Sequence, residues 1–109
     1  MTLQQLKYVV AITDSGSVNS AAKNLYVSQP SVSSAVKELE EEIGFELFRR
    51  SNRGVTVTAE GEEFLNYARQ ICEQYALLEG RFVAGRSRKQ FSVSTQHYTF
   101  AIHAVVEMV

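Results

Sequence analysis

Short polar side chains gather on one predicted helix, between Ser28 and Lys37, where they form a hydrogen-bonding face. Val32 and Val36 are four residues apart and mark the buried side of that helix. The other side presents Gln29, Pro30, Ser31, Ser33, Ser34 and Lys37. Glutamine can bind adenine through two hydrogen bonds, serine tolerates several base edges, and proline can contact a thymine methyl group. The pattern predicts a helix whose outer face recognises bases in a DNA major groove.

A second, shorter helix is expected just before this one, from about residue 18 to residue 25. Its small residues Ala21 and Ala22 allow a crossing helix to approach closely. Ser28 is a suitable N-cap for the next helix, and Pro30 falls in the first turn, where a missing N–H costs nothing. Two short helices joined by a tight turn predict a helix-turn-helix.

The net charge of the whole chain is −1, so any attraction to DNA phosphates must come from local clusters of positive charge. Residues 15–37 and 47–58 contain basic side chains and no acidic one, and the acidic run Glu38–Glu42 is expected to face solvent away from DNA. Polar and basic side chains in the two acid-free windows are expected to hold phosphates or to reach the minor groove. These candidates are Ser17, Asn19, Lys37, Arg50 and Arg53.

The flanking residues predict a small helical head with a two-stranded wing. Thr2 and Gln5 fit a capping box that begins a helix running to about residue 14. Gly44 is expected to end the Ser-rich helix. The turn signal at 52–54, followed by alternating valines at 55 and 57, predicts a hairpin. The fold class is therefore mainly α: a winged helix-turn-helix of three helices and a two-stranded wing over residues 1–58.

A much longer helix is expected from Ala59 to about Ala84, with Thr58 as its cap. Its apolar residues alternate between spacings of four and three, the rhythm of a coiled-coil seam. The predicted seam consists of Phe64, Ala68, Ile71, Tyr75, Leu78 and Phe82. Such a helix extends nearly 40 Å, at about 1.5 Å per residue, which exceeds what the head can cover. The helix is therefore predicted to be a dimerisation linker that pairs with a second copy.

The C-terminal residues suggest an interrupted domain. Residues 85–90 form a basic hinge, and residues 91–109 have the pattern of one strand and one helix of an α/β effector-binding domain. An apolar helix with nothing after it is a poor end for a complete domain, so the chain looks truncated.

The sequence does not support a disulfide-bonded, membrane-spanning, secreted, metal-binding or catalytic protein. The lone Cys72 cannot form an internal disulfide, and it is interpreted as a small buried residue of a cytoplasmic protein rather than a redox sensor. No apolar run approaches the roughly 18 residues of a membrane span, and the N-terminus lacks the layout of a signal peptide. His97 and His103 lack metal-ligand spacing. No catalytic constellation, metal or cofactor is expected.

Taken together, these pieces make the sequence similar to the N-terminal part of a LysR-type transcriptional regulator. The resemblance covers about residues 1–65. It is carried by Leu3-x-x-Leu6, Gly16-Ser17, Ala21-Ala22-x-x-Leu25, the run from Val27 to Ser33, Leu39-Glu40, Gly44-x-x-Leu47-Phe48-x-Arg50 and Thr58-x-x-Gly61. It implies a winged helix-turn-helix, a linker helix that dimerises antiparallel, and a C-terminal effector-binding domain of two lobes. A small-molecule effector is expected only if that domain exists.

Two functions follow as hypotheses. The first is sequence-specific binding of double-stranded DNA by a homodimer, used for transcriptional control. The alternative is a truncated interaction module that pairs with full-length relatives through the linker helix. An enzyme is not expected, because the residues for chemistry are missing.

Overall fold

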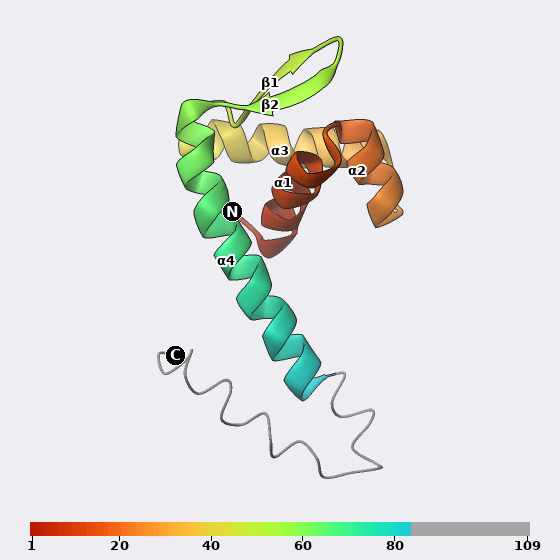
Figure 1. Cartoon of the computed structure of the whole chain (residues 1–109), viewed down its shortest axis with the longest axis vertical. Coiled ribbons are helices and arrows are strands. Elements are labelled where there is room, and N and C mark those ends of the chain that lie inside the picture. The colour runs from red at the N-terminus through yellow and green to blue at the C-terminus, as the bar shows by residue number, and fades with distance from the viewer. Residues whose placement is uncertain (84–109) are drawn as a thin grey trace. The chain divides into compact units, whose positions relative to one another are not determined.

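The computed structural model describes residues 1–83, so the predicted hinge (85–90) and effector-domain segment (91–109) lie outside the described residues. The described residues fall into two units, Met1–Cys72 and a second unit that begins at Glu73. The elements, shown in Figure 1, are α1 (Leu3–Ser15), α2 (Val18–Leu25), α3 (Gln29–Ile43), β1 (Phe48–Ser51), β2 (Gly54–Val57) and α4 (Ala59–Phe82). This is the predicted order of three helices, a hairpin and a long helix, and α4 ends two residues before the predicted Ala84.

Helix α1 begins at the predicted capping box. The Gln5 N–H donates to Thr2 Oγ1 at 3.1 Å, and the Thr2 N–H donates to Gln5 Oε1 at 2.8 Å. Gln5 has a second function, because its Nε2 donates to the Ala35 carbonyl of α3 at 3.1 Å. Gly16 ends the helix with φ +87°, a conformation that favours glycine. One side chain thus stabilises the start of α1 and joins it to α3.

The core lies where α1, α2 and α3 meet and is closed by the residues that precede the hairpin. Ala21 is fully buried and Ala22 nearly so, which lets α2 approach its neighbours closely, as predicted. Leu47 and Phe48 bring the chain back from α3 into this core. The largest of the fully buried side chains are Val9, Ile12, Val32, Val36, Leu39 and Leu47.

A group of hydrogen bonds holds the segment between α3 and α4 in place. The Glu40 carboxylate accepts from the Leu47 N–H at 2.7 Å and from the Phe48 N–H at 3.4 Å. The Thr58 N–H donates to the Leu47 carbonyl at 2.9 Å, and Thr58 Oγ1 donates to the Glu46 carbonyl at 2.7 Å. The expectation that the whole run Glu38–Glu42 faces solvent is therefore wrong for Glu40, because two backbone donors need its carboxylate.

The start of α4 is held against this same segment. Thr58 caps the helix as predicted, since its Oγ1 accepts from the Gly61 N–H at 3.0 Å. Gly61 is buried, and a Cβ placed on it would lie 2.7 Å from the Leu47 carbonyl oxygen. Further along the helix, the Arg69 guanidinium pairs with Asp14 of α1 at 2.8 Å.

Candidate nucleic-acid interface

Helices α2 and α3 meet through a turn of three residues, and each helix has a serine cap. Ser17 Oγ accepts from the Ser20 N–H at 3.1 Å, and Ser28 Oγ accepts from the Ser31 N–H at 3.2 Å. Tyr26 occupies the left-handed region with φ +60°, and its side chain is 93% exposed. A bulky residue in that conformation is uncommon. The two helices of the predicted motif are therefore encoded locally, by their caps.

The outer face of α3 carries the predicted polar residues, opposite the buried Val32 and Val36. The exposed members are Pro30, Ser31, Ser34 and Lys37, whereas Gln29 and Ser33 are half-buried at the edge of the face. The Gln29 Nε2 donates to Ser33 Oγ at 2.8 Å. The Ser28 and Ser31 hydroxyls lie 2.8 Å apart and form a hydrogen bond. Gln29, Ser31 and Ser33 of the polar face are therefore hydrogen-bonded to other side chains, whereas Ser34 and Lys37 belong to neither pair.

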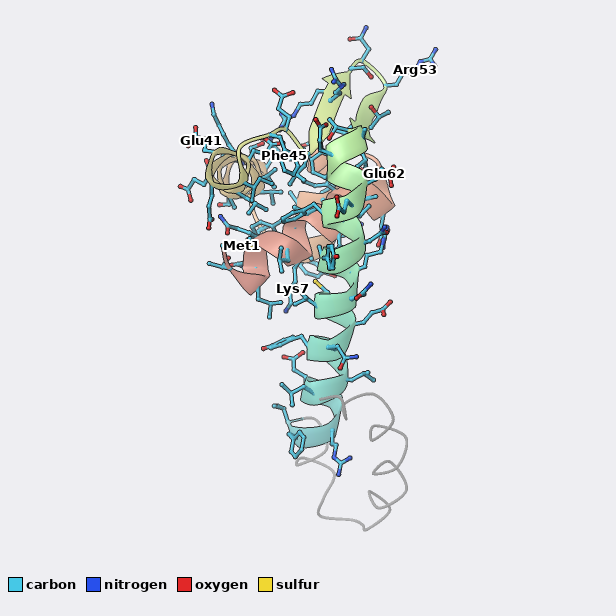
Figure 2. The ribbon with its side chains drawn as sticks, turned by 90° about the vertical axis from the view of Figure 1, so that its left-hand side faces the viewer. Met1, Lys7, Glu41, Phe45, Arg53 and Glu62 are labelled. Carbon is cyan, nitrogen blue, oxygen red and sulfur yellow. The ribbon has the colours of Figure 1, made fainter. Side chains whose placement is uncertain are left out.

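The hairpin adds positive charge beside this motif. Strands β1 and β2 pair antiparallel, with Arg50 opposite Val55 and Ser51 opposite Gly54, so the turn consists of residues 52 and 53. Arg50 and Arg53 are exposed, as expected for DNA contacts. Figure 2 shows Arg53 at the far end of the hairpin, with its side chain directed away from the helices. Arg49 is not among the predicted phosphate contacts, yet it is also exposed. Its position next to Arg50 is the sequence feature that marks it as a further candidate.

The hairpin is joined to the loop before α2. The Val55 N–H donates to the Gly16 carbonyl at 3.1 Å. Gly16 immediately precedes Ser17, the cap of α2, so this hydrogen bond brings the wing and the start of α2 together. Two groups of predicted phosphate contacts that are far apart in sequence are thus parts of one arrangement. Asn19, the other predicted contact on α2, is exposed.

The predicted seam on α4 divides into two parts. Phe64 packs against the core of the head, and Ala68 is buried, so both are covered by the chain itself. Tyr75 is half-buried. Ile71, Leu78 and Phe82 are 47%, 53% and 59% exposed, respectively. The members available to a second copy are therefore the later ones, and the seam stays a prediction.

Other chemistry is sparse in the described part of the chain. Cys72 is half-buried rather than fully buried, and burial raises the pKa of its thiol, although the Lys7 ammonium opposes the shift. Within residues 1–83, no three His, Cys, Asp or Glu side chains come together as a possible metal site. Over the same residues, none of the helices has the length and apolar character needed to cross a membrane.

Comparison with known proteins identifies the family. The family model described as "Bacterial regulatory helix-turn-helix protein, lysR family" matches residues 3–62, more than half of the chain. The chain belongs to the LysR family. The match includes α1, α2, α3, both strands and the start of α4. The fold is thus a LysR-type winged helix-turn-helix, as the resemblance implied.

Individual LysR-family proteins are similar over the same region. The regulator TfdT of Cupriavidus pinatubonensis is 44% identical over 71 residues, which are 65% of this chain and 31% of TfdT. TcbR of Pseudomonas sp. (strain P51) is 44% identical over 73 residues, 67% of this chain and 25% of TcbR. The crystal structure of a CbnR_DBD–DNA complex has a TM-score of 0.66 and 41% identity, covering 84% of this chain and 100% of that one. The chain therefore spans about a quarter to a third of the length of these two curated relatives.

Proposed function

We propose that this LysR-family chain binds double-stranded DNA sequence-specifically as a homodimer and that it controls transcription. The observation that carries the proposal is the two-sided character of α3. Val32 and Val36 are buried on one side, whereas Pro30, Ser34 and Lys37 are exposed on the other. A helix held in this way can enter a major groove with its polar face toward the bases. The similar chain of CbnR_DBD, which was crystallised with DNA, supports the same use of the fold.

The residues divide into base contacts and phosphate contacts. We assign base contacts to the polar face of α3 at Gln29, Pro30, Ser31, Ser33 and Ser34. Ser17 is suited to phosphate, because its oxygen accepts from the Ser20 N–H while its own hydroxyl proton remains able to donate. Lys37, Asn19, Arg50 and Arg53 are exposed and complete the phosphate set.

A second copy would present a second α3 to a related half-site. The exposed apolar side chains Ile71, Leu78 and Phe82 lie on α4 at spacings of seven and four, which suits a helix–helix seam. Exposed apolar surface of this kind on a helix favours association with a partner helix. We propose a regulatory rather than catalytic role, in the cytoplasm. The alternative of a module that acts by pairing with full-length relatives gains no support from a specific contact.

Selection of bound duplexes from a random DNA pool by the complete chain tests this proposal. The decisive variant is Ser34→Glu, because Ser34 is exposed and the substitution places a carboxylate on the face that would meet DNA. We expect a loss of about 2 kcal/mol or more, roughly 30-fold in affinity for the selected sequence. The thermal midpoint should stay within about 2 °C of wild type, since exposed substitutions seldom change stability.

Gln70→Glu is the matched control, because it adds the same charge to an exposed position of α4. Its affinity for the selected duplex should remain close to that of the wild type. Normal binding by Ser34→Glu would show that α3 does not face the bases.

A further inference from the structure

Gly54, next to the tip of the hairpin, lies against the backbone of Gly16 in the loop between α1 and α2. A Cβ built on Gly54 would lie 2.4 Å from the Gly16 carbonyl oxygen, a separation that no side chain can tolerate. Gly54 also has φ +123°, which side-chain-bearing residues rarely adopt. The next residue, Val55, donates its N–H to that same carbonyl at 3.1 Å. The wing therefore contacts this loop through a backbone approach that requires glycine.

The loop that receives the wing is itself well held. The Gly16 N–H donates to the Ile12 carbonyl at 2.8 Å, which ties the loop to the end of α1. Ser15 Oγ shares its single proton between the Ala11 carbonyl at 2.8 Å and the Ser17 carbonyl at 3.1 Å. On the other side, the Ala21 N–H of α2 donates to the Ser17 carbonyl at 3.1 Å. The Gly16 carbonyl is thus presented from a part of the loop that both neighbouring helices fix.

The base of the hairpin is anchored separately. Phe48 is buried in the core, and the Thr58 N–H donates to the Leu47 carbonyl at 2.9 Å. An isolated two-stranded hairpin is only marginally stable in water, and anchoring at its base alone would leave the tip free to move. The contact of Gly54 and Val55 with Gly16 adds a second point of attachment, next to the two turn residues. The tip of the wing is consequently held at a defined position.

We infer that Gly54 is a positioning residue for DNA binding, because its contact with Gly16 places Arg53 in fixed register with the start of α2. This inference rests on the proposed function. A guanidinium already held in place loses less conformational freedom when it binds a phosphate. Without the contact, Arg53 would still be present and charged, but it would no longer be held where the phosphate lies.

A double-mutant cycle on the complete chain tests this role. Gly54→Ala, Arg53→Ala and the double variant are titrated with the duplex selected by the wild type, at several salt concentrations. We expect Gly54→Ala to lose the same factor in affinity as Arg53→Ala and to make the slope of log K against log salt shallower by about 0.9, the value for one phosphate. In the double variant, the Gly54 substitution should have no further effect on affinity.

Gly44→Ala is the matched control. Gly44 has φ +86° and no atom within 4 Å of its would-be Cβ, so the change strains the backbone without touching the wing. It should lower the thermal midpoint but leave the salt slope at the wild-type value. A second measurement needs no variant: amide hydrogen exchange at Val55 should be slowed in the free chain, since its N–H is bonded to Gly16.

The outcomes separate the inference from the function. An unchanged salt slope in Gly54→Ala, an additive loss in the double variant or rapid exchange at Val55 would overturn the positioning role while leaving DNA binding intact. Failure of the wild-type chain to bind any selected duplex would instead refute the proposed function, and the inference with it.

Discussion

The substitution Gly61→Ala should destabilise the head, although alanine is the better helix former. Gly61 lies in the first turn of α4, and a Cβ there would lie 2.7 Å from the Leu47 carbonyl oxygen, 2.9 Å from Thr58 Oγ1 and 3.1 Å from Val57 Cγ1. The nearest of these atoms belongs to the backbone of a fully buried residue, so it cannot rotate away. The start of α4 must therefore shift away from the segment that precedes the hairpin.

The size of the effect follows from opposing contributions. Replacing glycine by alanine within a helix is worth about 1 kcal/mol in favour of the variant. Inserting a methyl group into a filled site costs about 1–3 kcal/mol. The shift also weakens the Gly61–Thr58 and Thr58–Leu47 hydrogen bonds, at about 1 kcal/mol each. The net loss should be about 2–4 kcal/mol.

Thermal unfolding followed by circular dichroism at 222 nm measures this loss, with all chains at one concentration because dimerisation would shift the midpoint. For a domain of this size the midpoint should fall by about 8–30 °C. Gly80→Ala is the control: it lies in the same helix with nothing within 4 Å, so it should be neutral or stabilising by up to about 1 kcal/mol. Because the closest clash is with Leu47, adding Thr58→Ala should not rescue Gly61→Ala. A Gly61→Ala midpoint equal to that of Gly80→Ala would refute the reasoning.

Three further results are expected. Glu40→Ala should cost about 1–3 kcal/mol in urea unfolding, because it removes the acceptor of the Leu47 N–H, whereas the exposed Glu41→Ala should stay within about 0.5 kcal/mol; equal losses would contradict the assignment. Tyr26→Asn should raise the free energy of unfolding by up to about 1 kcal/mol, since asparagine tolerates the left-handed backbone at φ +60°, and a lowered midpoint would argue against this. Burial raises the pKa of Cys72, so iodoacetamide should alkylate it more slowly in the folded chain than in urea at pH 8. The neutral thiol of Cys72 adds to the free energy of unfolding at pH values below its pKa in the unfolded chain. This contribution is lost as pH rises through the pKa of the thiol in the folded chain. Equal alkylation rates in the folded and unfolded chains would contradict the shift.

The ends of the helices were predictable because they are encoded by neighbouring residues. Ser17 and Ser28 cap the helices that follow them, and Gly44 ends α3 in the left-handed conformation. Each signal acts within one turn of backbone, so no knowledge of distant segments is needed. The hairpin turn at residues 52 and 53 followed from the same kind of local signal.

Contacts between distant segments were not predictable from one sequence. The turn signal at 52–54 accounts for Gly54 from its neighbours alone, and nothing near it in the sequence indicates that Gly16 is its partner. Glu40 looked like one more charge on a solvated face, because the acceptor role emerges only when Leu47 returns to the core. On the candidate site, spacing placed Gln29 on the polar face, but its half-buried position depends on the packing of α3.

The apolar pattern of α4 also shows what a single sequence cannot predict. Phe64 and Ala68 share the spacing of the later residues, yet the head of the same chain covers them. A helical stripe looks alike in sequence whether its partner belongs to the same chain or to another. In the structure, exposure distinguishes Ile71, Leu78 and Phe82 from the two residues that the head covers.

Under the proposed function, the hydrogen bond between Gln29 and Ser33 limits how an operator preference can change over evolution. Because the Gln29 amide donates to Ser33 Oγ, the orientation of each side chain depends on the other. Replacing either residue alone leaves its neighbour to rotate, so a single mutation would change both of the proposed base contacts together. A new target sequence would then be reached through paired substitutions at these positions. Intermediates that carry only one of them would recognise neither the old site nor the new one well.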